Sequence, residues 1–169
     1  GQLLRMLTGM LRPKVVVEIG TYSGYSALSM AAGMTADAVL HTFEINDEQE
    51  VFTRPWLEGS PYPPRIVLHI GEVEKLLPPM NLSIDLAFID ANKRQYVDYY
   101  NLLMPFIAPG GYILADNTLW DGHVIDPAYD RDAQTRGIRA FNDLVRDDEG
   151  VEKVILPLRD GLSLIRKIG

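Results

Sequence analysis

The most informative segment of the sequence is Val15-Val16-Val17-Glu18-Ile19-Gly20-Thr21-Tyr22-Ser23-Gly24-Tyr25-Ser26. A β-branched apolar run ends in an acid, a turn with two glycines follows, and a helix-forming pattern continues through Met34. This order predicts a strand, a tight loop and a helix, the opening unit of a nucleotide-binding α/β sheet. Gly20 and Gly24 allow the loop backbone to adopt positive φ and to approach a ligand closely.

The spacing in this loop favours one kind of ligand. Glu18, Gly20 and Gly24 form the pattern E-x-G-x-x-x-G, which differs from the G-x-G-x-x-G fingerprint of dinucleotide sites. Because an acid replaces the first glycine, the loop suits a diphosphate poorly. It suits a ligand with an ammonium group better, such as the methionine part of S-adenosylmethionine. A purely structural strand, turn and helix would have a similar sequence, and this alternative stays open.

Composition narrows the class of protein. A length of 169 residues with 47% hydrophobic side chains predicts a single domain, residues 1–169, with one core. The net charge of −7 argues against a nucleic-acid partner. The absence of cysteine excludes a disulfide framework, a thiolate metal site and a cysteine nucleophile. Without a signal-peptide pattern or a long apolar run, we expect a cytoplasmic protein with no membrane partner.

Apolar runs alternate with helical patterns, which predicts a doubly wound, mostly parallel sheet with an antiparallel C-terminal hairpin. The expected strands are 15–19, 38–45, 65–70, 84–89 and 112–115, followed by a hairpin of 151–158 and 162–168. The expected helices are 3–11, 26–34, one after Asp47 that Pro55 and the 59–64 cluster cut short, a turn at 71–77, 94–107 and 135–146. A turn is expected at 109–111 and a polar loop at 117–132.

Five of the predicted strands end in an acid or a glycine. Ligands of open α/β sheets bind beyond the carboxyl ends of the strands, so these positions are candidates for a binding site. Glu44 ends the second strand, where an acid commonly binds ribose hydroxyls. The alternative is that Glu44 is an acid near a helix N-terminus, where the macrodipole favours it. The five residues are Glu18, Glu44, Gly71, Asp90 and Asp116.

Asp90, Asp116 and Asn117 form an all-oxygen set of candidate metal ligands. Such a set suits Mg²⁺, Mn²⁺ or Ca²⁺, with water or substrate in the remaining positions. Lys93 follows Asp90 by three residues, and a nearby cation and partial burial would favour its neutral amine, a possible general base. Taken singly, such a lysine is usually a surface charge and an Asp-Asn pair is usually a turn. Their joint placement after neighbouring strands favours a site.

Several segments together resemble the cation-dependent O-methyltransferases of the catechol and caffeoyl-coenzyme A type, including their bacterial members. The resemblance implies a Rossmann-like class I methyltransferase fold. It also implies methyl transfer from S-adenosylmethionine to a hydroxyl of a small catechol-like vicinal diol, with a divalent cation. The segments are 18–26, 43–45, 88–93, 109–111, 115–122 and, resembling the family's last strand, 160–167.

The resemblance also implies roles for individual residues. Asp90, Asp116 and Asn117 would bind the metal, with Asp90 also bordering the cofactor and the reacting groups. Lys93 would be the catalytic base, and Trp120 a wall of the acceptor pocket. The cofactor would be bound by Glu18, Gly20, Thr21, Tyr22 and Ser26 at its methionine end, by Glu44 at its ribose, and by Gly71 to Val73 along its adenine. The chain departs from the family pattern at Asn92, at Val73 and in the stretch of Pro55 and 61–64, and these departures weaken the adenine assignment.

Gly1–Leu4 resembles a family segment that normally follows additional N-terminal helices, which cover the acceptor and form the dimer. We therefore expect upstream helices and a homodimer in the complete protein. A nicotinamide-dependent oxidoreductase is disfavoured by Glu18 and the missing pyrophosphate loop. A nucleic-acid methyltransferase is disfavoured because Asp90–Lys93 stands where an Asn/Asp-Pro-Pro-aromatic motif would be. A non-catalytic S-adenosylmethionine-binding module and a methyltransferase with a non-catechol acceptor stay open.

The remaining conspicuous residues are aromatic. His41 and His69 are expected to be core or edge histidines within strands rather than ligands. His123 follows Trp120 and could approach the acceptor. Among the tyrosines after Lys93, Tyr96 is the one best placed to reach the cleft, and the others are expected to pack in the core.

Overall fold

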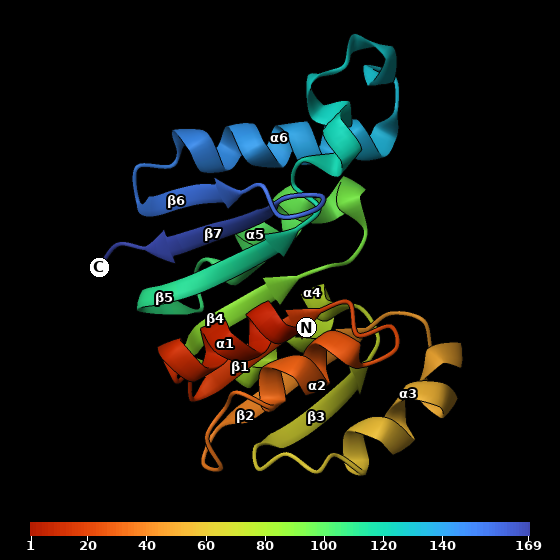
Figure 1. Ribbon diagram of the computed structural model, residues 1–169, viewed down its shortest axis with the longest axis vertical. Helices are drawn as coiled ribbons and strands as arrows, with labels where there is room; N and C mark the ends of the chain where they lie inside the picture. The colour runs from red at the N-terminus through yellow and green to blue at the C-terminus, as the bar shows by residue number, and fades with distance from the viewer. The chain divides into compact units, whose positions relative to one another are not determined.

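Seven strands and six α-helices alternate along residues 1–169, all of which the computed structural model describes (Figure 1). The strands follow the order β3-β2-β1-β4-β5-β7-β6. β1, β2 and β3 pair in parallel, whereas β7 pairs antiparallel with both β5 and β6. The predicted doubly wound sheet with an antiparallel C-terminal hairpin is therefore confirmed. The chain divides into two compact units, Gly1–Leu86 and Ala87–Gly169.

The elements of the first unit carry the glycine-containing loop. They are α1 (Gln2–Leu11), β1 (Val15–Ile19), α2 (Tyr25–Ala31), β2 (Val39–Glu44), α3 (Glu48–Glu58), β3 (Arg65–Ile70) and α4 (Val73–Leu76). β4 (Ile84–Ile89) runs across the division, and the second unit continues with α5 (Tyr96–Leu103), β5 (Ile107–Asp116), α6 (Ala133–Asp147), β6 (Val151–Leu156) and β7 (Leu162–Lys167). None of the helices combines the length and the apolar character that a membrane span requires.

The first unit is held together by β1 and by a close contact of two helices. Val16 and Val17 of β1 are fully buried, as a strand covered on both faces requires. The Thr8 hydroxyl of α1 lies 2.9 Å from the Met30 carbonyl of α2. A Cβ on Gly33 would lie 2.1 Å from the Arg5 carbonyl oxygen. The position after α2 therefore requires glycine because α1 passes so close.

α3 ends at the predicted 59–64 cluster, with Gly59 as its C-cap, but Pro55 does not shorten it as expected. The helix continues through Pro55 to Glu58. A proline inside a helix removes the hydrogen bond to the carbonyl four residues earlier. That carbonyl belongs to Val51, which is 84% exposed, so water is available to replace the lost bond. Continuation buries Leu57, whose Cδ2 would lie 2.9 Å from a Cβ on Gly24. Packing of the last turn thus outweighs the local cost of the proline.

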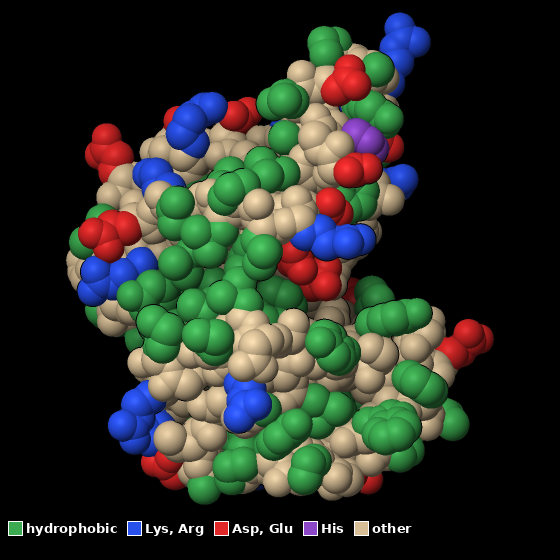
Figure 2. Space-filling model, viewed as in Figure 1, with side chains coloured by type: hydrophobic (Ala, Val, Ile, Leu, Met, Phe, Trp, Pro, Cys, Tyr) green, Lys and Arg blue, Asp and Glu red, His purple; other side chains and the backbone are tan.

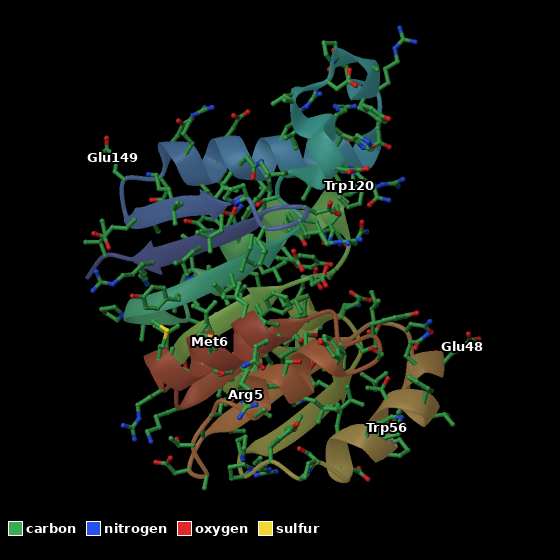
Figure 3. All side chains as sticks on the ribbon, viewed as in Figure 1. Arg5, Met6, Glu48, Trp56, Trp120 and Glu149 are labelled. Carbon is green, nitrogen blue, oxygen red and sulfur yellow. The ribbon has the colours of Figure 1, made fainter.

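The outer face of α3 is unusually apolar. Val51, Phe52 and Trp56 are exposed by 84%, 58% and 61%. In Figure 3, Trp56 lies on α3 at the surface of this unit, and Figure 2 shows hydrophobic side chains gathered there. Nothing in the structure indicates what covers this face.

Two histidines of the first unit form a pair rather than a ligand set. His41 Nδ1 of β2 and His69 Nε2 of β3 lie 3.0 Å apart, and His69 also stacks on Phe43. Burial, together with the facing His69 and Arg65, lowers the pKa of His41 to about 4. Burial also lowers the pKa of His69. Both histidines are half-buried strand residues, as expected.

Two boundaries in the second unit differ from the expectation. β5 begins at Ile107, so the predicted turn at Pro109–Gly111 lies inside the strand. Only Tyr112–Asp116 pairs with β7, and Gly110 has a φ of 79°. The glycine therefore distorts the strand before its paired part, which begins where the strand was predicted to begin. α5 is shorter than expected, because a 3-10 turn at Lys93–Gln95 precedes it and it ends at Leu103.

Candidate active site

The loop after β1 is fixed by a chain of hydroxyl groups. Glu18 is fully buried, and its Oε2 accepts a hydrogen bond of 2.5 Å from the Thr42 hydroxyl. The Thr42 oxygen also lies 2.5 Å from the Thr21 hydroxyl. Since a hydroxyl has one hydrogen and Thr42 donates it to Glu18, Thr21 donates to Thr42. Glu18 thereby ties the loop to β2, and its direct contact with a cofactor stays a prediction.

The glycines of this loop have the backbone conformations that the sequence predicted. Gly20 and Gly24 have φ values of 100° and 78°, and Gly24 caps α2. Gly20 N–H donates to the Phe43 carbonyl at 2.9 Å. Tyr22 also has a positive φ and is 71% exposed, whereas Ser26 is half-buried at the start of α2. The loop therefore combines a fixed backbone with an exposed aromatic side chain.

Glu44 lies at the end of β2 and organises the backbone around it. Its Oε2 accepts from Tyr22 N–H at 2.8 Å, and its Oε1 accepts from Asn46 N–H at 2.9 Å. Its carbonyl accepts from Gly71 N–H at 2.8 Å, and Gly71 has a φ of 133°. The structure thus brings Glu44 together with the glycine loop and with Gly71. Val73, two residues beyond Gly71, is buried in the first turn of α4.

The second unit contains the candidate metal ligands at the ends of two strands. Asp90 directly follows β4, and Asp116 is the last residue of β5. Asn117 has a φ of 61°, and its N–H donates to Asp116 Oδ1 at 2.7 Å. Its amide Nδ2 lies 3.5 Å from Asp160 Oδ2, in the turn of the β6–β7 hairpin. An amide nitrogen directed at Asp160 leaves the amide oxygen of Asn117 available for a cation.

Lys93 is the buried charge of this unit. Its side chain is only 8% exposed, and its Nζ donates to Asp90 Oδ1 at 2.8 Å and to the Tyr96 hydroxyl at 2.7 Å. Tyr96 is fully buried and does not reach a cleft, which corrects the expectation from sequence. The reason is that its ring packs edge-on against Phe141 of α6, at 5.5 Å between centroids. Tyr96 instead contacts the candidate base.

The electrostatics of the site favour a cation. Burial raises the pKa of Asp116, and the neighbouring carboxylates Asp90 and Asp160 raise it further, against the opposing effects of the Asn117 N–H and Lys93. These carboxylates destabilise one another's charge, and a divalent cation would relieve that repulsion. No three or more His, Cys, Asp or Glu side chains converge to hold a metal. A cation on Asp90, Asp116 and Asn117 would therefore need water or substrate oxygens as further ligands.

The segment after Asn117 is held by α6. Arg139 donates to the carbonyls of His123, Val124 and Asp126 at 2.8–2.9 Å. Trp120, labelled in Figure 3, is half-buried with a φ of 48°. The His123 ring stacks on Tyr129 at 3.5 Å between centroids. The 117–132 segment therefore contains two ordered 3-10 turns beyond the N-terminal end of α6 (Figure 1).

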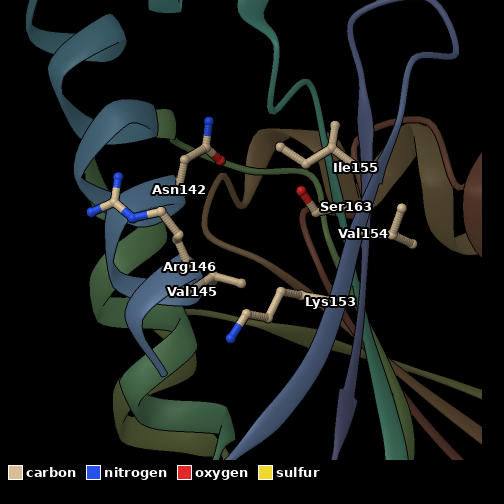
Figure 4. A pocket seen from close by; sticks show the side chains of 7 residues that line it. All are labelled: Asn142, Val145, Arg146, Lys153, Val154, Ile155 and Ser163. Carbon is tan, nitrogen blue, oxygen red and sulfur yellow. The ribbon is translucent and has the colours of Figure 1, made fainter. Parts of the chain in front are cut away.

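A cavity elsewhere in this unit does not include the candidate ligands. It lies between α6 and the β6–β7 hairpin and has a volume of about 210 Å³. Figure 4 shows its walls, which are Asn142, Val145, Arg146, Lys153, Val154, Ile155 and Ser163. Because no candidate metal ligand, nor Lys93 or Trp120, lines it, this cavity is separate from the candidate site.

Gly137 is a supporting residue that the sequence reasoning missed. A Cβ on this α6 residue would lie 2.3 Å from the Lys93 carbonyl oxygen and 2.8 Å from Arg94 Cα. α6 therefore presses directly on the 3-10 turn that carries Lys93. A lone glycine inside an amphipathic helix was the available signal, since such a position commonly has a packing reason.

We expect Gly137→Ala to lower both stability and activity. Alanine favours a helix by about 1 kcal/mol, but overpacking against backbone costs about 1–3 kcal/mol, so a net loss of up to about 2 kcal/mol is expected. Displacing the turn should also lower kcat. Ala140→Gly, on the exposed side of α6, is the control. It should lower stability and leave kcat unchanged. Thermal unfolding and a methyl-transfer assay measure both. A Gly137→Ala protein with parental kcat would contradict the coupling.

Comparison with known proteins is consistent across sequence and structure. The family model described as O-methyltransferase matches residues 1–168. Caffeoyl-CoA O-methyltransferase 2 of Zea mays is 33% identical, over 99% of this chain and 68% of that protein. The structure of a putative O-methyltransferase from Klebsiella pneumoniae is 28% identical with a TM-score of 0.91, over 99% of this chain and 79% of the other.

A second solved structure is the O-methyltransferase TomG from Streptomyces achromogenes, involved in tomaymycin synthesis and determined in complex with S-adenosylmethionine. It is 25% identical with a TM-score of 0.90, over 99% of this chain and 79% of the other. The match to the family model covers nearly the whole chain. The chain therefore belongs to the O-methyltransferase family of S-adenosylmethionine-dependent enzymes.

Proposed function

We propose that this enzyme transfers a methyl group from S-adenosylmethionine to one hydroxyl of a small catechol-like vicinal diol, in a reaction that requires a divalent cation. The observation that carries the proposal is the cluster of Asp90, Asp116 and Asn117 with the buried Lys93 beside it. An oxygen ligand set next to a buried amine suits the deprotonation of a hydroxyl. The Zea mays relative is named for a caffeoyl-CoA substrate, which is consistent with an aromatic acceptor.

Residues of the first unit are proposed to bind the cofactor. The solved relative TomG contains S-adenosylmethionine. In this chain the Gly20–Gly24 loop provides backbone that a ligand can approach, and Glu44 provides a carboxylate for two ribose hydroxyls. Tyr22, Ser26, Gly71 and Val73 complete the proposed contacts of this unit.

Residues of the second unit are proposed to bind the cation and the acceptor. Asp90, Asp116 and Asn117 would hold Mg²⁺, Mn²⁺ or Ca²⁺. When bound, the cation would supply a fixed position for both oxygens of the diol and a lower pKa for one hydroxyl. Trp120 is proposed to contact the aromatic ring of the acceptor.

In the proposed reaction Lys93 Nζ takes the proton of the acceptor hydroxyl. The resulting oxygen forms a bond to the methyl carbon, while the carbon–sulfur bond breaks and its electrons stay on sulfur. An anion and a sulfonium are consumed, and an ether and a neutral thioether form. Because charge disappears in this step, a site that excludes water favours it.

Glu44→Ala should weaken cofactor binding by roughly 1.5–3 kcal/mol, or about ten- to a hundred-fold, because two charge-assisted hydrogen bonds to ribose are lost. Calorimetric titration with S-adenosylmethionine measures this. Glu48→Ala is the matched control, since it removes an exposed acid from the first turn of α3. An unchanged dissociation constant in Glu44→Ala would return Glu44 to the role of an acid near a helix start.

The acceptor class is tested with labelled S-adenosylmethionine and four compounds: catechol, resorcinol, phenol and caffeoyl-CoA. The proposal expects transfer to catechol and caffeoyl-CoA, which have vicinal hydroxyls, and almost none to the others. A chelator should stop the reaction and excess Mg²⁺ should restore it. Transfer to phenol as fast as to catechol would reject the diol requirement. Transfer to none of these compounds would favour a non-catechol acceptor.

A further inference from the structure

The Tyr96 side chain contacts Lys93 and the backbone of the two strand ends beside it. It is the first residue of α5 and is fully buried. Its hydroxyl lies 2.7 Å from Lys93 Nζ, 3.0 Å from the Asp116 carbonyl oxygen and 3.3 Å from the Ile89 carbonyl oxygen. The carbonyls belong to the ends of β5 and β4, immediately beside the two acidic candidate ligands. One hydroxyl thus connects the candidate base to the backbone of both ligand-bearing strand ends.

The directions of these hydrogen bonds follow from the chemistry of the groups. A phenol has one hydrogen, and a backbone carbonyl can only accept. The Tyr96 hydroxyl therefore donates to Asp116, the nearer carbonyl, and must accept from Lys93. Lys93 Nζ also lies over the Tyr96 ring, 4.9 Å from its centre, so the lysine contacts both the hydroxyl and the ring of Tyr96. The lysine nitrogen is the donor in its contact with the hydroxyl.

Lys93 Nζ has three positions besides its bond to carbon. Asp90 Oδ1 occupies one at 2.8 Å, and the Tyr96 hydroxyl occupies a second. One position remains. It carries the third hydrogen when Lys93 is an ammonium and the lone pair when Lys93 is a neutral amine. We propose that Tyr96 is a positioning residue that directs this remaining position of Lys93 at the acceptor hydroxyl. The inference rests on the proposed function and deepens it.

Asp90 alone is a weaker constraint on the lysine than Tyr96. The Asp90 side chain is 41% exposed, so water competes with Lys93 for its carboxylate oxygens. Asp90 would also share its carboxylate with the bound cation. Tyr96 is fully buried, and its ring is fixed edge-on by Phe141. The buried phenol therefore determines where the amine lies, and it does so before any ligand binds.

The first test compares two single hydroxyl deletions on the same helix. Tyr96→Phe should lower kcat about 10- to 100-fold, since misplacement of a reacting group by about 1 Å has effects of this size. The KM for catechol and the dissociation constants of S-adenosylmethionine and Mg²⁺ should change less than about threefold. Tyr100→Phe, which removes a hydroxyl that bonds Asp148 at 2.7 Å, should leave kcat unchanged. A parental kcat in Tyr96→Phe would overturn the proposal.

A second readout does not depend on turnover. Nuclear magnetic relaxation of the Lys93 side-chain amine, measured without ligands, should show a well-ordered Nζ in the parent and in Tyr100→Phe, and a mobile one in Tyr96→Phe. An equally ordered Nζ in Tyr96→Phe would overturn the positioning role, even if the parent methylates no diol. If the parent methylates no diol but Lys93 Nζ is ordered in the parent and mobile in Tyr96→Phe, only the proposed function is rejected.

A third variant covers the case in which Tyr96→Phe does not fold. Phe141→Leu keeps the Tyr96 hydroxyl but removes the ring contact that fixes it. It should lower kcat and the order of Lys93 Nζ by a smaller factor, and unchanged values of both would contradict the proposal.

Discussion

Lys93→Ala is expected to slow methyl transfer by roughly 10²–10⁴-fold, the usual loss when a positioned general base is removed. The lysine side chain is 8% exposed and makes two hydrogen bonds. Water therefore does not take over the role of the amine in the parent. Binding of cofactor and Mg²⁺ should persist, because Lys93 is proposed as a ligand of neither. The loss should shrink as pH rises, since hydroxide then deprotonates the acceptor directly. Initial rates of transfer to catechol across a pH series measure this.

One further variant and one control distinguish the role of Lys93 as a proton acceptor from the effect of its positive charge. Lys93→Arg retains the positive charge but cannot give up its proton in a protein, so it should be about as slow as Lys93→Ala. Lys75→Ala is the matched control, because Lys75 is an exposed lysine paired only with Glu72 on the surface. If Lys93→Ala transferred as fast as the parent at neutral pH, Lys93 would not be the base.

Asp116→Ala is expected to abolish cation-dependent activity. Of the three candidate ligands only two are anionic, and removal of one leaves a single carboxylate and an amide, too little charge to retain a hard cation. Calorimetry with Mn²⁺ or Mg²⁺ should show loss of binding, while S-adenosylmethionine still binds. Asp98→Ala, which removes an exposed carboxylate from α5, should retain both. Parental metal affinity in Asp116→Ala would remove Asp116 from the ligand set.

The fold was predictable where local and tertiary preferences agree. β1, β3 and β4 have the bounds expected from their continuous apolar runs. The prediction was wrong in two places: Pro55 does not shorten α3, which ends at the predicted 59–64 cluster, and β5 already begins at Ile107. In α3, burial of Leu57 outweighs the proline, and Gly110 allows an irregular strand before the pairing with β7 begins. Neither the burial of Leu57 nor the start of the β5–β7 pairing can be read from the neighbouring sequence.

The site was predictable only in part. Strand ends place carboxylates at known positions, so Glu44, Asp90 and Asp116 could be named from sequence. The roles of Tyr96 and Gly137 depend on how α6 packs against the Lys93 turn, which brings together residues far apart in the sequence. Helical spacing placed Tyr96 one turn beyond Lys93 but could not show that Phe141 of α6 buries its ring.

We propose that the glycine loop and Glu44 bind the cofactor, whereas Asp90, Asp116 and Asn117 bind a cation that only the transfer step requires. The most direct measurement is calorimetric titration of the protein with S-adenosylmethionine, with Mg²⁺ and then with a chelator, beside assays of transfer to catechol in the same two buffers. We expect a cofactor dissociation constant that changes less than about threefold and turnover that disappears with the chelator and returns with excess Mg²⁺. Undiminished turnover in the chelator, or loss of cofactor binding with the cation, would contradict it.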